Sequence, residues 1–537
     1  SLVAKEVARR TGRVFFDTDE EIVKLAGKSV AEIFTQDGES DFRRRERQVV
    51  EEACQQHGLI IALGGGAIMD HHDYELLAES GYIICLEARP QTIYRRLFQQ
   101  DSGGSGDEIR PLIAGAHPLE QIRQLKDSRQ PFYAGADWTI HTDVLTVSQV
   151  AVEVLRAVKI LGSAHRDTGS NIACMVITPT QSYPVFVGDG LLGTLGEKLR
   201  QEGLSGHAVI ISDENVFSLY GYKVKQVLGD SEFDVLSFVI SPGEKSKGIG
   251  TATRIYDFLV EQRVERDDVI VALGGGVVGD LAGFVAATFL RGLSWVQVPT
   301  SLMAMVDASI GGKVAIDHSR GKNLIGAFYQ PRFVLADIRV LTSLPQREFT
   351  SGWAEVIKHG LIIDRDFATF LDQASGELLK LEPGLLTQAV ARSAAIKAEV
   401  VTEDEKEAGK RTILNYGHTI AHGLETATGY SRFLHGEAVS VGMVGAANLS
   451  QRLGLLSPED VLYQQTLLQK FCLPVNFSGV DLARVMRAME LDKKVKRESI
   501  RWVLLDRIGH AVVRTGIAQE DVMSVLEELS QPWVSLP

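Results

Sequence analysis

Three side chains with metal-binding chemistry stand far apart in the chain, with basic residues among them. Glu355, His418 and His435 offer one carboxylate and two imidazoles, the donors of a catalytic zinc site that keeps one position open. His422 follows His418 by four residues, so both imidazoles would share one face of a helix. Surface histidine pairs have the same spacing. Spacing alone therefore leaves open which of these residues would bind a metal.

A glycine-rich turn follows an apolar run. Residues 274–280 read Gly-Gly-Gly-Val-Val-Gly-Asp, directly after residues 269–273. Glycine has no Cβ, so such a turn brings backbone N–H groups close to the phosphates of a dinucleotide. Asp213 and Asn215 follow another apolar run. A carboxylate at the end of a strand can accept hydrogen bonds from the ribose hydroxyls of a dinucleotide. The pattern predicts a nucleotide site, and a tight structural turn is the alternative.

Basic and amide residues concentrate where an anionic substrate would need them. Residues 307–313 and 321–323 are glycine-rich and contain lysines, and two adjacent glycines in the first segment favour a loop. Four polar residues follow one another at steps of four, three and four, which predicts one helix face: Arg411, Asn415, His418 and His422. Ile413 and Leu414 lie among them, so we interpret this face as buried and functional.

The elements that would position these residues form two α/β regions and a helical region. Residues 1–160 alternate short apolar strands with amphipathic helices, which predicts βαβ units and a largely parallel sheet. Residues 161–172 are small and polar and are interpreted as a linker. Residues 173–344 form a second α/β domain with strands near 208–212, 235–240, 269–273 and 295–298. Helical periodicity dominates residues 345–537, with a short β pair at 500–505 and 510–514.

Composition excludes some classes of protein. A chain of 537 residues with 45% hydrophobic and 23% charged residues is expected to form two to four globular domains. A net charge of −13 argues against nucleic acid as the main partner. Four scattered cysteines without a Cys-x-x-Cys pair favour reduced thiols. Residues 1–12 lack an apolar core and the apolar run 269–279 is short, so we expect a cytoplasmic protein without signal peptide or membrane span.

From about residue 173 to its end, the chain resembles the 3-dehydroquinate synthases. The motifs that carry the likeness are 299–302, 307–313, 321–328, 353–358, 411–422 and 434–437. The resemblance implies a Rossmann-type α/β domain and a mainly helical metal-binding domain. It also implies an NAD- and metal-dependent lyase, with Zn2+ or Co2+, that converts 3-deoxy-D-arabino-heptulosonate 7-phosphate to 3-dehydroquinate in aromatic amino-acid biosynthesis. Hydride transfer to NAD would acidify a neighbouring C–H, phosphate would leave, and the hydride would return.

The resemblance also implies roles for individual residues. Glu355, His418 and His435 would bind the metal, while Asp307 and Lys358 match active-site positions. The substrate phosphate would be bound by His422, Lys313, Asn323, Lys493 or Lys494, and Arg291 from the neighbouring subunit of a homodimer. The substrate carboxylate would be bound by Lys397, Arg411 and Asn415. NAD would be bound by Asp213, Asn215, Glu244, Lys247, Gly276, Val277, Val278, Gly279, Asp280, Thr300, Ser301, Lys313 and Lys322.

Residues 1 to about 160 resemble shikimate kinase, a P-loop kinase with a parallel sheet. The likeness rests on residues 17–19, 38–46, 64–66, 109–112 and 129–133. It implies shikimate binding by Asp19, Arg43, Gly65, Gly66 and Arg129, an ATP lid carrying Arg110, and Mg2+ binding at Ser1 and Asp17. The family's phosphate loop would end just before Ser1. We therefore expect little kinase activity from the chain as written, and a working kinase in a longer native chain.

Three alternatives remain from the sequence. A sibling cyclase, such as 2-deoxy-scyllo-inosose synthase, acts on a sugar phosphate without a carboxylate, and Arg411 with Lys397 argues against it. An NAD- and metal-dependent alcohol dehydrogenase would accumulate NADH with a simple polyol. In the third alternative, the N-terminal half is a non-catalytic binding module.

Overall fold

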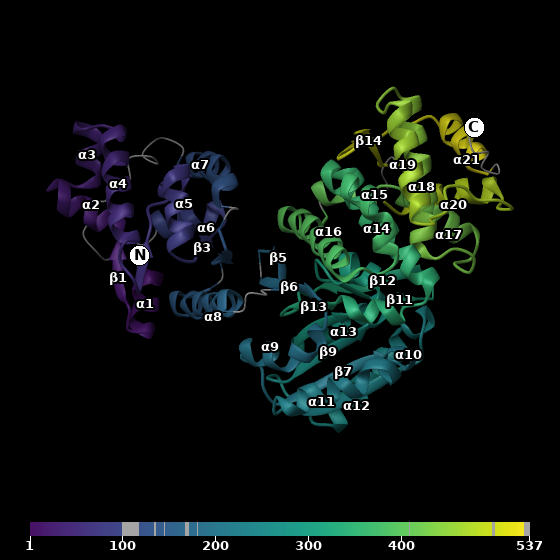
Figure 1. Cartoon of the computed structure of the whole chain (residues 1–537), viewed down its shortest axis with the longest axis horizontal. Helices are drawn as coiled ribbons and strands as arrows, with labels where there is room; N and C mark the ends of the chain where they lie inside the picture. Colours follow the sequence, from purple (N-terminus) through teal and green to yellow (C-terminus); the bar gives the residue numbers. More distant parts are fainter. Residues whose placement is uncertain are drawn as a thin grey trace. The chain divides into compact units, whose positions relative to one another are not determined.

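The computed structural model describes residues 1–98, 118–133, 136–143, 145–166, 171–179, 181–319, 321–407, 409–496 and 500–530 (Figure 1). The chain divides into two compact units. The first is Ser1–Ser170 with Ile177–Ser182, and the second is Asn171–Val176 with Tyr183–Pro537. No helix in the described ranges is both long and apolar enough to cross a membrane.

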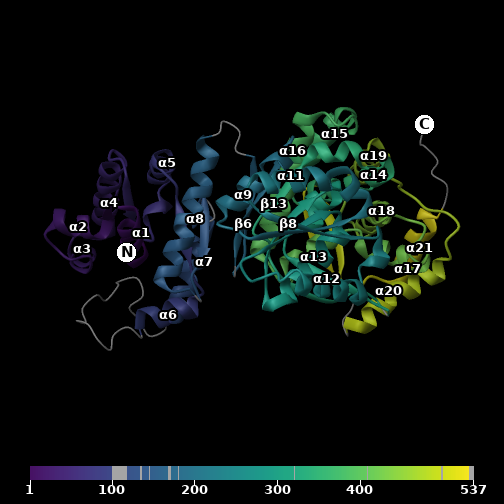
Figure 2. The same ribbon diagram turned by 90° about the horizontal axis from the view of Figure 1, so that it is seen from below.

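The first unit contains parallel strand pairs and helices, as the alternation of its sequence predicts. β1 (Val14–Asp17) pairs with β2 (Leu59–Ala62), and β3 (Ile84–Glu87) pairs with β4 (Trp138–His141). The helices are α1 (Leu2–Thr11), α2 (Thr18–Ala26), α3 (Val30–Gln36), α4 (Glu39–Cys54), α5 (His71–Ser80), α6 (Pro90–Phe98), α7 (Pro118–Tyr133) and α8 (Val147–Arg166) (Figures 1 and 2). Residues 161–166, which we interpreted as the start of a linker, continue α8.

A seven-stranded sheet forms the first half of the second unit. The strand order is β5 (Ile172–Ile177), β6 (Ser182–Gly188), β13 (Val334–Asp337), β10 (Ser294–Pro299), β9 (Val269–Gly274), β7 (His207–Asp213) and β8 (Asp234–Ile240). From β6 to β8 every neighbouring pair is parallel. The four strands predicted near residues 208, 235, 269 and 295 are confirmed.

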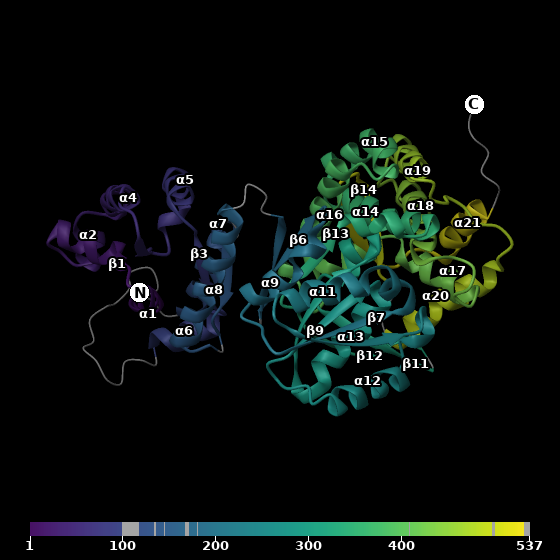
Figure 3. The same cartoon turned by 60° about the horizontal axis from the view of Figure 1, so that its bottom comes forward.

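Residues of the central strands alternate between two apolar cores, which explains why their sequences are continuously apolar. In β7, Ile210 lies in the larger core, while Ile211 lies in the core formed with α12 (Ile249–Glu261) and α13 (Gly276–Thr288). Figure 3 shows these two helices beside the sheet. The remaining helices of this half are α9 (Leu195–Gln201), α10 (Glu214–Val216) and α11 (Tyr222–Asp230).

The second half is mainly helical. It contains α14 (Gln346–Ile362), α15 (Arg365–Leu379), α16 (Pro383–Glu403), α17 (His418–Ala427), α18 (His435–Arg452), α19 (Pro458–Lys470), α20 (Leu482–Lys496) and α21 (Gln519–Leu529). The predicted β pair near its end is the antiparallel hairpin of β14 (Trp502–Arg507) and β15 (His510–Arg514). A second antiparallel hairpin, β11 (Lys313–His318) with β12 (Gly321–Phe328), precedes β13 in the chain.

Candidate active site

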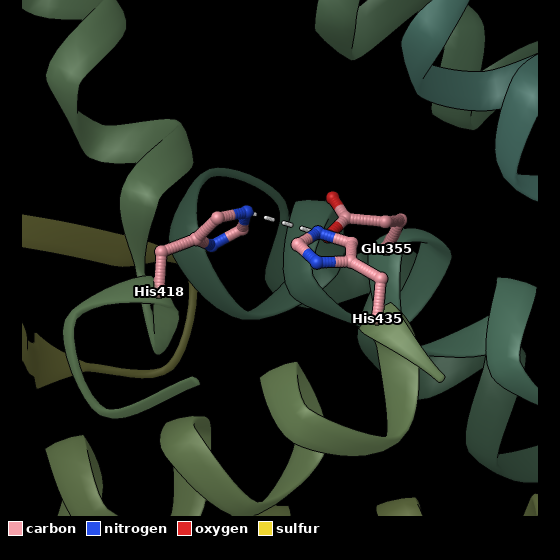
Figure 4. A group of neighbouring side chains, drawn as sticks. All are labelled: Glu355, His418 and His435. Carbon is pink, nitrogen blue, oxygen red and sulfur yellow. Dashed lines mark ion pairs between the residues drawn. The ribbon is translucent and has the colours of Figure 1, made fainter. Parts of the chain in front are cut away.

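Three helices of the second half bring together one carboxylate and two imidazoles (Figure 4). Glu355 lies on α14, and His418 and His435 are the first residues of α17 and α18. Nε2 of His418 is 3.8 Å from Oε1 of Glu355, and Nε2 of His435 is 3.9 Å from the same oxygen. One donor atom from each residue lies within 4.8 Å of the other two. This arrangement suits a single divalent ion with nitrogen and oxygen ligands.

Glycines at helix starts allow this approach. A Cβ on Gly436, directly after His435, would collide with the carbonyl oxygen of Ser351 on α14. Gly417, directly before His418, has φ 82°, a left-handed conformation that glycine adopts without strain. The chain can therefore start α18 against α14, and it can turn sharply before α17.

Each histidine is oriented through its second ring nitrogen. Nδ1 of His435 lies 3.2 Å from Oε1 of Glu425, and Nδ1 of His418 lies 3.3 Å from the carbonyl oxygen of Tyr416. A carboxylate or carbonyl behind a ligand histidine fixes its tautomer and directs the other nitrogen to the metal. Here that other nitrogen faces Glu355.

The electrostatics of Glu355 and His418 fit a cation site. Glu355 is fully buried, and neither of its carboxylate oxygens has a hydrogen-bond partner, although Lys358 forms an ion pair with it. Burial and the charge of Lys358 lower the pKa of His418 well below its usual value, which favours the neutral, ligating imidazole. Burial also lowers the pKa of His435, but the hydrogen bond and charge of Glu425 outweigh it and leave this pKa raised.

His422 lies one turn after His418 on α17, with its ring centre 5.5 Å from that of His418 and 6.3 Å from that of His435. It is not part of the three-donor group. The single helix face predicted for residues 411–422 is wrong. Arg411 and Asn415 lie in a short 3-10 helix, η9 (Lys410–Asn415), and the chain turns at Gly417 before α17 begins. The four polar residues are therefore presented by two elements.

A network of buried charges adjoins the donor group. Asp307 lies in η7 (Ala304–Ala308), a short π-helical turn where we expected a loop, and forms an ion pair with Lys397 of α16. Lys358 and Lys397 are 1% and 6% exposed. Burial opposes ionisation of Asp307, but the charges of these two lysines outweigh it and hold its pKa well below the usual value. Burial lowers the pKa of Lys397.

A second donor group consists of Asp307, Glu355 and His359. Its two carboxylates already form ion pairs with Lys397 and Lys358, so it is organised as an ion-pair network.

Glu407 is a residue that the sequence analysis missed. Lys313 forms an ion pair with it, and Nδ2 of Asn415 donates to its Oε1 at 2.8 Å. Burial raises the pKa of Glu407, but the bonds from Lys313 and Asn415 outweigh burial and leave it lowered. Arg411 is 2% exposed and donates to the backbone oxygen of Glu405 at 2.6 Å. Glu407 stands in a run of charged residues, a pattern typical of solvated surface, so only its φ of 58° marks it as unusual.

Most residues expected to bind NAD follow the carboxyl ends of β7, β8, β9 and β10, the edge at which parallel sheets bind nucleotides, whereas Lys313 and Lys322 lie in β11 and β12. Asp213 ends β7 and caps α10, accepting from the N–H of Asn215 at 3.0 Å. Gly276, Val277, Val278, Gly279 and Asp280 form the first turn of α13. Thr300 and Ser301 follow β10, and the N–H of Thr300 donates to Gly274 at 3.0 Å.

Charged groups join this edge to the β11–β12 hairpin. Lys247 lies 2.5 Å from Oδ2 of Asp280 and also contacts Asn323. Burial raises the pKa of Asp280 to about 6. Lys322 lies 3.5 Å from Glu244. Asn323, expected at the substrate phosphate, therefore stands beside the nucleotide residues.

Arg291 and Lys494 were also expected to bind the substrate phosphate. Arg291 ends η6 (Phe289–Arg291), where it is exposed and has φ 69°. Lys494 lies on α20, but its side chain, like that of Lys493, falls outside the described residues.

The shikimate residues predicted in the first unit gather at one turn. Cβ atoms on Gly64 and Gly65 would lie 3.0 Å from Oδ1 of Asp19 and 3.1 Å from Nη1 of Arg129, and one on Gly66 would collide with Arg43. Arg43 pairs with the buried Glu46 at 2.5 Å. The hydroxyl of Ser1 donates to Oδ2 of Asp17 at 2.6 Å. Arg110 lies outside the described residues.

Comparison with known proteins shows to which family the chain belongs. Residues 237–351 match the family model for the 3-dehydroquinate synthase N-terminal region, and residues 352–495 match that for its C-terminal region. The 3-dehydroquinate synthase of Pelobacter propionicus is 48% identical over 332 residues, which cover 62% of this chain and 92% of that protein. The chain belongs to the 3-dehydroquinate synthase family. The synthase of Nostoc punctiforme is 44% identical over 352 residues, covering 65% of this chain and 97% of that one.

The first unit carries a second family. Residues 1–159 match the shikimate kinase family model, so the chain joins a shikimate kinase domain to a 3-dehydroquinate synthase, as the motifs predicted. Two solved structures are 26% identical to this chain. A 2-epi-5-epi-valiolone synthase from Streptomyces hygroscopicus with NAD+ and Zn2+ has TM-score 0.61, covering 65% and 97% of the two chains. A 2-deoxy-scyllo-inosose synthase with carbaglucose-6-phosphate, NAD+ and Co2+ has TM-score 0.62, covering 66% and 99%. The predicted fold class is confirmed.

Proposed function

We propose that the synthase half releases phosphate from 3-deoxy-D-arabino-heptulosonate 7-phosphate and closes the product to 3-dehydroquinate, using NAD and Zn2+ or Co2+. The N-terminal half is a shikimate kinase domain, a family whose reaction transfers phosphate from ATP to shikimate with Mg2+. The observation that carries the proposal is the convergence of Glu355, His418 and His435 beside the Asp307–Lys397 ion pair. We assign residues 173–344 to NAD binding and 345–537 to the metal and substrate.

Glu355, His418 and His435 hold the divalent ion. A buried carboxylate without hydrogen-bond partners is costly unless a cation is bound next to it, and Lys358 supplies only one charge. A divalent ion bound here acts as a Lewis acid toward a substrate oxygen. Glu425 accepts a hydrogen bond from Nδ1–H of His435 in the tautomer that leaves Nε2 free for the ion.

The turn at the start of α13 holds the dinucleotide phosphates. The first N–H groups of a helix have no acceptor within the helix, and the positive end of the helix dipole favours phosphate. NAD bound here would supply reversible hydride transfer, so that phosphate would be released with no net NADH. The chain's contribution is to position the nucleotide through Asp213, Asn215, Glu244, Lys247, Asp280, Thr300, Ser301 and Lys322.

Cations and amides bind the two anionic groups of the substrate. Lys397, Arg411 and Asn415 bind the carboxylate, and His422, Lys313, Asn323, Lys494 and the partner subunit's Arg291 bind the phosphate. Two of these, Lys313 and Asn415, are held by Glu407 in the free protein. The substrate anion competes with Glu407 for them, so Glu407 sets part of the binding free energy.

In the kinase half, Asp19, Arg43, Gly65, Gly66 and Arg129 bind shikimate. The two guanidinium groups lie beside the same glycine turn, which suits bidentate binding of one carboxylate. Ser1 and Asp17 hold Mg2+, and Arg110 belongs to the ATP lid.

The synthase half forms a homodimer in the cytoplasm. The support is β12, which is exposed along most of its length and presents Leu324 and Phe328 at 64% and 43% exposure. An exposed apolar strand is a ready surface for pairing with a second copy. Light scattering tests this, because Leu324→Asp is expected to shift the protein from dimer to monomer.

Phosphate release by the purified full chain tests the synthase assignment. We expect release that stops with a chelator, resumes when Zn2+ or Co2+ is added back, requires NAD and leaves no net NADH. A matched substrate without the carboxylate should turn over far more slowly. Chelator-resistant release, or NADH that accumulates with the product, would contradict the proposal.

A further inference from the structure

Gln297 is a polar residue in the middle of a buried strand. It lies on β10, opposite Ala272 of β9 on one side and Val334 of β13 on the other. Its neighbours Val296 and Val298 are at most 1% exposed, and Gln297 itself is 6% exposed. A buried amide costs free energy unless its polar atoms find partners. The contacts of this side chain therefore indicate its role.

The amide of Gln297 reaches two functional segments at once. Its Nε2 donates to the backbone oxygen of Ser309 at 3.3 Å, and Ser309 is fully buried two residues after Asp307. At its other end, Oε1 lies against Gly279, where a Cβ would be only 2.6 Å away. Gly279 belongs to the turn assigned to NAD. One side chain thus joins the nucleotide turn to the loop of Asp307.

A second contact brings the same two segments together. A Cβ on Gly276 would lie 3.5 Å from the Cβ of Ala308, the neighbour of Asp307. The turn and the loop therefore pack directly on each other, and Gln297 links both from the sheet. A shift of one segment relative to the other has to break or strain the contacts of this amide.

We propose that Gln297 is a positioning residue that fixes the nucleotide turn relative to Asp307, and so aligns NAD with the substrate. This inference rests on the proposed function, because hydride transfer needs both reactants held close to the reacting geometry. Gln297 acts through Gly279 and Ser309. Its loss should therefore lower kcat and weaken NAD binding, with less effect on the KM of the sugar phosphate.

Two variants of the full chain test the role. Gln297→Leu keeps most of the volume and removes both polar atoms, whereas Gln297→Glu keeps the shape and removes the Nε2 donor. We expect kcat to fall about tenfold and the Kd of NAD to rise several-fold in both. Val296→Ala is the control, because it lies on the same strand and faces the other core. It should lower Tm and leave kcat and the Kd of NAD unchanged.

A double-mutant cycle distinguishes a positioning role of Gln297 from a merely structural one. Gly279→Ala places a methyl group against Oε1 of Gln297, so it should weaken NAD binding in the wild-type background. In a Gln297→Ala background the methyl group has room. The effect of Gly279→Ala on the Kd of NAD should then be smaller by about fivefold or more.

Two results would overturn the inference. One is Gln297 variants that keep wild-type kcat and NAD affinity despite a lower Tm. The other is a double-mutant cycle in which the effects of the two changes on NAD binding are additive. A wild-type chain that releases no phosphate would instead defeat the proposed function.

Discussion

Replacing Glu425 should weaken metal binding without removing a ligand. Glu425 is 8% exposed, and its Oε1 accepts from Nδ1 of His435 at 3.2 Å. Partners of this kind are worth about 10- to 100-fold in metal affinity, which corresponds to about 1.4 to 2.7 kcal/mol. Glu425→Ala removes the acceptor and the charge, so we expect a loss near about 100-fold. Glu425→Gln keeps an oxygen acceptor and should lose about tenfold.

The assay is titration of the metal-free full chain with Zn2+ in competition with a chelator of known affinity. Glu528→Gln is a matched control, because Glu528 pairs with Arg452 on the surface of the same half, far from the donor group in sequence. It should leave the Kd of zinc unchanged. If Glu425→Ala binds zinc within about twofold of wild type, the argument that this carboxylate orients His435 is refuted.

Three further predictions concern other parts of the chain. Gly436→Ala sets a methyl group against the carbonyl of Ser351, so we expect a loss of about 1–3 kcal/mol in the free energy of unfolding together with weaker zinc binding, measured by denaturation and titration. The pKa of Asp280 is raised to about 6, so its carboxylate is protonated below that pH and loses its ion pair with Lys247. The Kd of NAD should therefore rise as pH falls through about 6, a dependence absent in Asp280→Asn, as calorimetry across that pH range would reveal. Arg43→Ala should weaken shikimate binding by about 10- to 100-fold on calorimetry of the full chain, since a charged hydrogen bond is lost, and unchanged binding would remove Arg43 from the site.

The common edge of most residues proposed to bind NAD was predictable from the sequence, because these residues follow apolar runs. Ile210 and Ile211 are buried on opposite faces, which is what a continuously apolar strand indicates. Carboxyl ends of parallel strands meet at one edge, so the order of the runs was sufficient to bring Asp213, Gly276 and Thr300 together. No knowledge of distant contacts was needed.

The arrangement of the residues proposed to bind substrate was harder to predict from the sequence, because local patterns there conflict with the tertiary structure. Residues 411–422 have helical spacing, yet Gly417 adopts φ 82° and divides them between η9 and α17. Glu407 stands in a run of charged residues, whose usual state is solvation. Its ion pair with Lys313 joins residues 94 positions apart in the chain, and the spacing of local residues cannot predict such a contact.

The metal-donor group depends on close approach between helices, and side-chain chemistry alone does not provide it. Glu355 and His435 are brought together because Gly436 lets α18 start against α14. Gly442 does the same for α17 and α18, since a Cβ there would collide with the carbonyl oxygen of Gly417. Each glycine lowers intrinsic helix stability, and in return the buried carboxylate meets two imidazoles. An alanine at either position would collide with a backbone carbonyl oxygen, so both glycines are required by the close approach that brings the donor residues together.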